Sequence, residues 1–284
     1  MNKDKVLVLG NGMLGNAFKR HGYEVVGREA FDWDWEGMQC DVARDAYIHE
    51  HNKLFEPFGV IINCIGKSDT RWCEDPANFD ELMGVNAELP RYLSTVCEGS
   101  KKKFVHISTG CVYDTRGQGK AYEYGFLSAH CRYVIAKWAG ECYMRDEDLI
   151  IRPRLLFDSD VARGRNNLIQ KLPEFPNYLD EFNSVTSCDT IVESVGALLE
   201  VNQAGVFNVA NRGTYTMYEM AKALGLDGGM IAQEELHQSQ GLFLVNNVMD
   251  TERLEEFYCP RDTIYELKHC CELLLKNIDN AKSV

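Results

Sequence analysis

The chain has 284 residues, of which 45% are hydrophobic and 26% are charged, proportions that are ordinary for a globular enzyme. Its net charge of -13 argues against a nucleic-acid-binding surface, because phosphate backbones are bound by clustered Lys and Arg. The amino terminus has no signal-peptide core, and no apolar run reaches the roughly 20 residues that span a bilayer.

The first half of the chain alternates apolar runs with helical patterns. The apolar runs predict strands, and the amphipathic stretches between them predict helices. The strands are expected at 5–9, 24–27, 60–65, 104–108 and 149–152, and the helices at 13–21, 43–55, 85–97 and 129–144. Strand–helix alternation at this spacing predicts an α/β fold with a Rossmann-type, doubly wound parallel sheet.

The pattern loosens after residue 152. The later elements are expected to be a turn at 158–160, a helix near 166–172, a loop at 173–183, a helix at 189–201, a strand at 205–210 and helices at 217–224 and 264–277. No repeat or low-complexity linker separates them from the first half. We therefore expect a domain over 1–155 and, over 156–284, mainly a small lobe with some segments returning to the core.

A glycine-rich loop follows the first predicted strand and opens a helix. It consists of Gly10, Asn11, Gly12, Met13, Leu14 and Gly15. The first glycine permits a tight turn, the second lets the backbone approach a pyrophosphate, and the third packs helix on strand. The position and pattern predict that the domain over 1–155 binds a dinucleotide.

Two further positions bear on which dinucleotide binds. The second predicted strand ends at Gly27, followed by Arg28, which can pair with a 2′-phosphate, and by Glu29, which can bond a ribose hydroxyl. Arg28 favours NADP, with NADPH preferred and NAD still open. Asp41 and Val42 precede the next predicted helix, where they either contact the adenine or cap the helix.

A phenol and an ammonium lie one turn apart on the helix predicted at 129–144. Tyr133 and Lys137 are four residues apart, so both side chains emerge on one face. A neighbouring ammonium would lower the phenol pKa from about 10 towards neutrality, which suits a general acid–base. Thr109, at the end of a predicted strand after Ser108, would orient a substrate carbonyl. This trio predicts hydride transfer.

At this point the chain resembles the extended short-chain dehydrogenase/reductase family, and within it the 4-keto-6-deoxy-nucleotide-sugar reductases of the dTDP-4-dehydrorhamnose reductase type. The likeness covers nearly the whole chain. It is carried by VIINC at 60–64, WCEDP at 72–76, VNA at 85–87, the Ser-Thr strand end, Tyr133 to Glu141, and GVFNVAN at 205–211. The resemblance implies cofactor contacts at Cys64 and Gly66 as well as in the glycine loop, and a nucleotide sugar as substrate partner.

One cysteine stands next to the predicted site. The eleven cysteines are dispersed, without CxxC pairs or Cys/His metal spacing, which indicates reduced thiols in a cytoplasmic protein without a metal. Cys111 lies in TGCVY at 109–113, which is similar to segments of bifunctional nucleotide-rhamnose 3,5-epimerase/4-reductases and of GDP-L-fucose synthase. The resemblance implies that Cys111 abstracts protons at C3 and C5, and that Lys171 in NLIQK is the complementary acid.

The carrier diphosphate needs positive charge in an acidic protein. We expect Arg165, with Asn166 and Asn167, to bind it, because the planar guanidinium suits a pyrophosphate. Arg152 and Arg154 are alternatives that can equally be structural. The sequence does not identify the nucleotide as UDP, dTDP or GDP.

Several functions fit these residues. The leading expectation is an NADPH-dependent 3,5-epimerase/4-reductase that forms a 6-deoxy-L-hexose nucleotide such as L-rhamnose. A 4-reductase without epimerase activity and a non-catalytic NADP-binding regulatory subunit are the alternatives. A 4,6-dehydratase is disfavoured, because it needs an Asp-Glu pair where this chain has Gly110 and Cys111. We expect no nucleic-acid or membrane partner, and a homodimer stays open.

Overall fold

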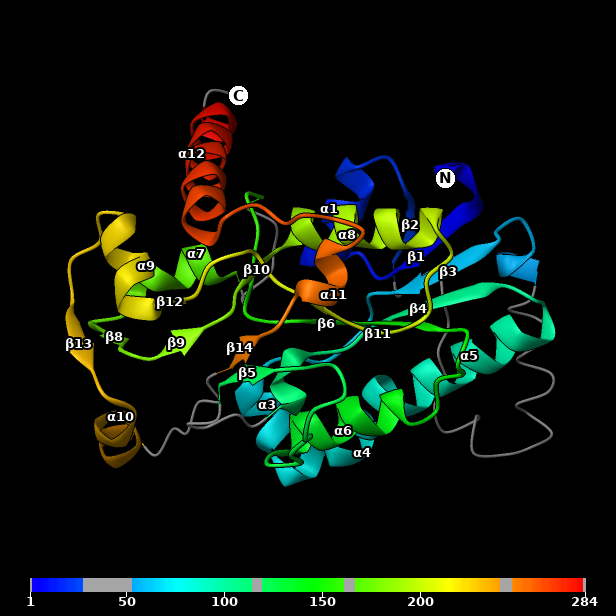
Figure 1. Ribbon diagram of the computed structural model, residues 1–284, viewed down its shortest axis with the longest axis horizontal. Coiled ribbons are helices and arrows are strands. Elements are labelled where there is room, and N and C mark those ends of the chain that lie inside the picture. Colours follow the sequence, from blue (N-terminus) through cyan, green and yellow to red (C-terminus); the bar gives the residue numbers. More distant parts are fainter. Residues whose placement is uncertain (1, 28–52, 114–118, 161–166, 241–246, 283–284) are drawn as a thin grey trace. The chain divides into compact units, whose positions relative to one another are not determined.

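Two compact units are built from interleaved stretches of the chain. The computed structural model describes residues 2–27, 53–113, 119–160, 167–240 and 247–282 (Figure 1). Unit 1 consists of Met1–Val112, Ala129–Ile151 and Leu199–Val206, and unit 2 consists of Tyr113–Ser128, Arg152–Leu198 and Phe207–Val284. The helix predicted at 43–55 lies largely outside the described residues.

The main sheet has six strands in the order β11-β6-β4-β3-β1-β2. Their bounds are β1 Val6–Leu9, β2 Glu24–Val26, β3 Val60–Asn63, β4 Lys103–Ile107, β6 Leu149–Pro153 and β11 Gly205–Val209. The pairs β1–β2, β1–β3, β3–β4 and β4–β6 are all parallel. This is the Rossmann-like sheet that the alternating pattern predicts, so that expectation is confirmed.

Helices of unit 1 cover both faces of this sheet. Helix α1 (Met13–Arg20) lies on one face, while α5 (Leu89–Gly99) and α6 (Arg132–Glu141) lie on the other (Figure 1). Strands β1, β3, β4 and β6 are largely buried, as their continuous apolar runs predict. On the α5 face the core combines strand residues with one side of the helix: Leu7, Leu9, Ile61, Phe104, Leu89, Tyr92, Leu93 and Val96.

A series of short helical turns leads into α5. It comprises α3 (Thr70–Glu74), a 3-10 turn (Pro76–Asn78), α4 (Phe79–Met83) and a π-helical segment (Gly84–Glu88). Two carboxylates start the first turns, since Asp69 accepts from the backbone N–H of Trp72 at 3.0 Å and Asp75 from that of Ala77 at 2.9 Å. The sequence predicted one helix over 85–97. It did not predict the short turns before that helix, nor that the helix begins as a π-helical segment.

Unit 2 holds many short elements around a core of its own. Its helices are α7 (Leu168–Lys171), α8 (Cys188–Glu200), α9 (Met217–Ala223), α10 (Gln233–Gln240), α11 (Glu252–Glu255) and α12 (Thr263–Lys282). Its short strands pair two by two: β7 (Leu156–Phe157) with β10 (Thr186–Ser187), β8 (Asn177–Leu179) with β13 (Gly229–Ile231), β9 (Phe182–Asn183) with β12 (Tyr215–Thr216), and β5 (Lys120–Ala121) with β14 (Val248–Met249). The loop predicted at 173–183 is therefore wrong, because it contains β8 and β9.

The core of unit 2 joins its helices to its short strands. It is formed by Phe157, Leu168, Ile169, Leu172, Tyr178, Val185, Met220, Ala221, Leu267, Cys270 and Leu274. Helix α12 is the longest element of the unit and contributes one side of this core. Across the part of the chain that the structure describes, none of the helices has the length and apolarity that a membrane crossing requires.

Helix α6 and the π-helical segment approach each other at one glycine. A Cβ added at Gly140 would lie 2.4 Å from the backbone oxygen of Asn86 and 3.5 Å from the Cα of Ala87. Both obstacles are backbone atoms, so a side chain there would have to push the helix away. The contact therefore fixes the distance of α6 from the segment that carries Asn86.

We expect Gly140→Ala to destabilise the protein by about 1–3 kcal/mol, the usual cost of overpacking. Gly99→Ala is the matched control, because a Cβ at Gly99 in α5 meets nothing within 4 Å. Alanine in a helix should leave the control as stable as wild type or slightly more stable. Urea unfolding of the three proteins measures both effects, and equal midpoints for the two variants would contradict the close contact.

Candidate active site

The predicted site residues of unit 1 gather at the carboxyl ends of the central strands. Leu9, Asn63 and His106 are neighbours across β1, β3 and β4, so the loops after these strands emerge at one edge. The chain runs from β1 to β2 on one side and continues with β3 on the other. Ligands of doubly wound sheets bind at such a reversal, outside the carboxyl ends of the strands.

The loop after β1 has the geometry that its glycines predict. Gly10 has φ +106°, which favours glycine, and its N–H donates to the oxygen of Val26 at 2.8 Å. A Cβ at Gly15 would lie 1.8 Å from the Gly10 oxygen, whereas one at Gly12 would meet nothing within 4 Å. Asn11 is exposed, and Met13 and Leu14 form the first turn of α1.

The start of α1 is suited to an anion. Its N-cap residue, Gly12, has no side chain to cap it, and its first turn holds no acidic residue. The backbone N–H groups at a helix amino terminus favour a phosphate, and the open space beside Gly12 lets one approach. These residues fit the pyrophosphate of a dinucleotide.

The loop after β3 is held from two sides. Cys64 donates its N–H to the oxygen of Leu9 at 2.9 Å. The Asn86 side chain accepts from the N–H of Lys67 at 2.8 Å and donates to the oxygen of Lys67 at 2.9 Å. A Cβ at Gly66 would lie 3.6 Å from the Nζ of Lys137, so the loop and α6 meet at this glycine.

Lys137 is a buried ammonium between this loop and the end of β4. Its Nζ donates to the oxygen of Ile107 at 2.7 Å, and its side chain is buried. Burial lowers the pKa of Lys137 to about 8, although Glu141 and the Cys64 thiol oppose the change. The structure thus brings Lys137 together with Gly66 and the strand that leads to Thr109.

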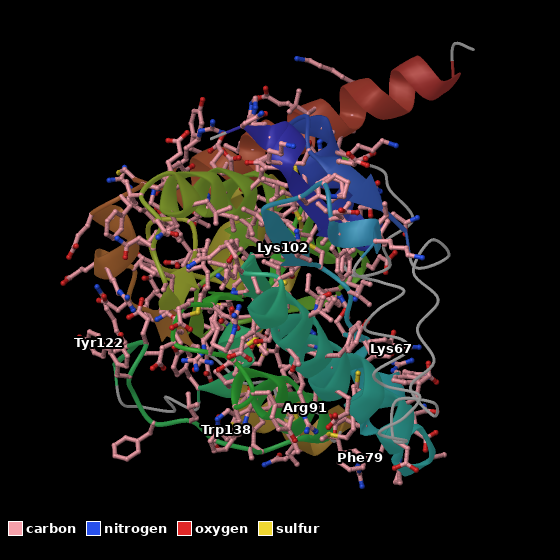
Figure 2. All side chains as sticks on the ribbon, turned by 90° about the vertical axis from the view of Figure 1, so that its right-hand side faces the viewer. Lys67, Phe79, Arg91, Lys102, Tyr122 and Trp138 are labelled. Carbon is pink, nitrogen blue, oxygen red and sulfur yellow. The ribbon has the colours of Figure 1, made fainter. Side chains whose placement is uncertain are left out.

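Tyr133 lies on the first turn of α6 and packs on α3 and α4. Its half-buried ring lies against a cluster that includes Trp72, Cys73 and Phe79. Figure 2 shows the surroundings of these helices, with Lys67, Phe79, Arg91 and Trp138 labelled. Tyr133 and Lys137 are one turn apart on the same helix, as their spacing predicts.

A carboxylate that the sequence analysis missed caps this helix. Glu74 accepts from the backbone N–H of Arg132 and from that of Tyr133, each at 3.1 Å. The N-cap residue, Cys131, is not one of the strong capping residues Ser, Thr, Asp or Asn. That absence was the available signal, because a helix start without Ser, Thr, Asp or Asn needs acceptors from elsewhere.

Cys111 lies on a 3-10 turn (Gly110–Val112) after β4, and Thr109 directly precedes that turn. The buried Thr109 accepts the N–H of Cys111 on its Oγ1 at 3.2 Å, so its hydroxyl keeps its proton for donation. Cys111 is half-buried. Burial raises the pKa of Cys131 to about 11, with Glu74 and Cys111 nearby adding to it, so the Cys131 thiol stays protonated close to both.

The other predicted residues lie in unit 2 or outside the described residues. Asn167, at the start of α7, is committed to the backbone of Asp158, accepting its N–H at 3.1 Å and donating to its oxygen at 2.8 Å. Lys171 ends α7 and is half-buried. Outside the described residues lie Arg28, Asp41, Val42, Arg165 and Asn166.

The two alternative arginines are built into unit 2. Arg152 donates to the Tyr113 hydroxyl at 2.6 Å and to the backbone oxygen of Glu123 at 3.1 Å, and Arg154 donates to Asn183 at 3.1 Å. Both side chains are buried. These bonds support the structural interpretation of the pair.

Comparison with known proteins gives this arrangement a family. The family model described as RmlD substrate binding domain matches residues 4–237. The chain belongs to this family. A probable low-salt glycan biosynthesis reductase of Haloferax volcanii is 27% identical over 230 residues, which cover 72% of this chain and 74% of that protein.

Solved structures agree with the RmlD fold. A dTDP-4-dehydrorhamnose reductase of Bacillus anthracis, in complex with NADP, has a TM-score of 0.76 at 18% identity and covers 94% of this chain and 98% of that chain. The L780 UDP-rhamnose synthase of Acanthamoeba polyphaga mimivirus has a TM-score of 0.78 at 15% identity, with 95% and 98% covered. RmlD membership confirms the expected NAD(P)-dependent oxidoreductase and the reductase resemblance.

Burying the Lys137 ammonium should cost stability. Its pKa of about 8 in the folded protein lies below its ordinary 10.5, so at pH 7 the folded state carries the full cost, about 3 kcal/mol. Between pH 8 and 10.5 the unfolded chain binds more protons, and stability should rise with pH. We expect Lys137→Met, which lacks the charge, to be more stable than wild type at pH 7.

That advantage should shrink as pH rises from 8 to 10.5, which urea unfolding at pH 7, 9 and 10.5 measures. The Met variant leaves the Ile107 oxygen without the ammonium, so the net gain at pH 7 should be about 1–2 kcal/mol. If the stability difference between the Met variant and wild type does not change with pH, the pKa of Lys137 is not lowered by burial.

Proposed function

We propose that this chain reduces the C4 ketone of a nucleotide-linked 4-keto-6-deoxyhexose with NADPH. The observation that carries the proposal is the buried Lys137 ammonium, one turn from Tyr133 and beside both Gly66 and the strand end that leads to Thr109. The names of the Bacillus anthracis reductase and the mimivirus synthase support this substrate class.

Each residue of the trio has a distinct task in the proposed reaction. NADPH, when bound, supplies the hydride. The Tyr133 phenol donates its proton to the C4 oxygen, which gains negative charge as the ketone is reduced. The Lys137 ammonium would bond the cofactor ribose and, being one turn from Tyr133, would favour proton transfer from the phenol, while the Thr109 hydroxyl would donate to the same C4 oxygen and orient it.

The rest of the chain would supply the remaining binding groups. Residues 1–155 would hold the cofactor through the glycine loop, Cys64 and Gly66, with Arg28 favouring NADPH and with Asp41 and Val42 near the adenine. Residues 156–284 would mainly hold the sugar nucleotide, with Arg165, Asn166 and Asn167 at its diphosphate. Asn167, whose side chain bonds the backbone of Asp158, would contribute to the diphosphate site by fixing the start of α7.

Tyr133→Phe should abolish NADPH oxidation by a 4-keto-6-deoxy sugar nucleotide, with a loss of at least about 100-fold in kcat. Binding of NADPH should survive within a few-fold, because the ring still fills its place. Absorbance at the nicotinamide band and fluorescence titration measure the two quantities. If the variant turns over at a rate close to that of wild type, Tyr133 is not part of the mechanism.

The preference for NADPH is tested on wild type alone. If wild type uses NADH as well as it uses NADPH, the proposed role of Arg28 is wrong.

Cys111 supports a second activity at the same carbon skeleton. The backbone N–H of Cys111 donates to the Thr109 hydroxyl at 3.2 Å, so this cysteine belongs to the turn that carries the group proposed to orient the C4 ketone. Protons on the carbons next to a ketone are acidic, and a thiolate is a suitable base. We propose that Cys111 abstracts the protons at C3 and C5, with Lys171 as the complementary acid, before the ketone is reduced.

Cys111→Ser should stop solvent deuterium from entering C3 and C5 of the 4-keto sugar, because a hydroxyl is too weak an acid to supply an oxyanion at neutral pH. Reduction of a sugar that is already epimerised should largely persist, since Thr109, Tyr133 and Lys137 are unchanged. Mass spectrometry of the sugar after reaction in deuterated water measures both the deuterium incorporated and the amount of sugar reduced. If wild type exchanges no deuterium in any sugar that it reduces, the protein is a 4-reductase alone. A wild type that binds NADPH and reduces none would be a regulatory subunit.

A further inference from the structure

The first turn of α6 depends on a carboxylate from another helix. The helix starts at Arg132, after the N-cap residue Cys131, whose thiol is only a weak acceptor where Ser, Thr, Asp or Asn would usually cap the helix. The two oxygens of Glu74 instead accept from the N–H groups of Arg132 and Tyr133, at 3.1 Å each. A charged acceptor at a helix amino terminus also opposes the positive end of the helix dipole.

Glu74 is itself held in place. It ends α3, whose start is capped by Asp69, and its backbone oxygen accepts from the Arg132 guanidinium at 2.8 Å. That guanidinium lies 4.0 Å from the Glu74 carboxylate. The two residues that precede Glu74, Trp72 and Cys73, belong to the cluster in which the Tyr133 ring packs. Helix α3 thus contacts Tyr133 through both backbone and ring.

The two ends of the Tyr133–Lys137 pair are anchored separately. Lys137, one helical turn after Tyr133, donates to the backbone oxygen of Ile107. At the start of the helix, Glu74 provides the side-chain acceptors for the two backbone N–H groups. Loss of Glu74 would therefore leave Lys137 in place and release the turn that carries the phenol.

We propose that Glu74 is a positioning residue for hydride transfer, which holds the Tyr133 phenol at the reacting carbonyl by capping α6. The inference rests on the proposed function, since it assigns Tyr133 the proton-donating role. Displacing a reacting group by about 1 Å can cost 100-fold in rate. The side chain of Glu74 is 33% exposed, and losing one helix cap removes only part of the stability of a domain, so the chain should still fold without it.

Three variants of the full chain separate positioning from folding. Glu74→Ala removes both acceptors, and Glu74→Gln keeps one amide oxygen that can serve one of the two N–H groups. Asp75→Ala is the matched control, because the neighbouring carboxylate caps the 3-10 turn at Ala77 and bonds no residue of α6 in the described structure. For each, single-turnover NADPH oxidation, the Kd of NADPH and deuterium exchange of the 131–141 backbone are measured.

We expect Glu74→Ala to slow the single-turnover reduction by about 10- to 100-fold while the Kd of NADPH stays within threefold. Glu74→Gln should recover part of the rate, and Asp75→Ala should stay within threefold of wild type. Amide exchange at 131–133 should rise at least tenfold in Glu74→Ala only. A rate within twofold of wild type for Glu74→Ala, or equal losses in Glu74→Ala and Asp75→Ala, would overturn the proposal.

Other results also decide it. If Glu74→Ala does not fold, the Gln variant is read alone: a slower rate at unchanged Kd supports the proposal, and an unchanged rate overturns it. If wild type reduces no 4-keto sugar, the proposed function fails and the exchange data judge the cap by themselves. Faster exchange at 131–133 in Glu74→Ala then supports the cap, and unchanged exchange overturns it.

Discussion

The buried ammonium of Lys137 is the constraint around which the site is built. A charge in a protein interior must be matched by polar atoms, and Lys137 finds one in the oxygen of Ile107 at the end of β4. This bond draws α6 against the carboxyl edge of the sheet. A Cβ at Gly66, in the loop after β3, would lie 3.6 Å from the ammonium nitrogen, so this loop lies next to the charge. The charge costs stability at neutral pH, as is common for groups kept for chemistry.

The surrounding helices hold α6 at that edge. Gly140 lets α6 touch the backbone of the π-helical segment, and Asn86 from the same segment grips the backbone of Lys67. π-Helical turns inside α-helices occur frequently at functional sites. Here the Asn86 side chain of the π-helical segment bonds the loop after β3, while the backbone of the same segment packs against α6. The loop after β3 and the Tyr133 helix are therefore positioned by the same short stretch of chain.

The parts of the site that the sequence predicted are those with local signals. Gly10, Gly12 and Gly15 mark a strand-to-helix turn, and a four-residue spacing places Tyr133 and Lys137 on one helix face. Those signals need no knowledge of distant contacts. The same holds for the main strands, whose long apolar runs predict a buried parallel sheet.

The missed parts depend on contacts between distant residues. Nothing near Glu74 in sequence shows that it caps a helix almost 60 positions later. The two- and three-residue strands β8 and β9 are too short to show a period-two pattern, so the segment read as loop. The roles of Arg28, Arg165 and Asn166 stay predictions, since these residues lie outside the described structure.

The most direct test of the central claim is to follow labelled hydride into the sugar. NADPH carrying deuterium at the transferred position would be incubated with the protein and a 4-keto-6-deoxy nucleotide sugar, and the product examined by NMR. The account predicts deuterium on C4 of a 6-deoxyhexose nucleotide, in stoichiometric amount with the NADPH oxidised. Bound NADPH with no deuterium on C4 of any such sugar would contradict it.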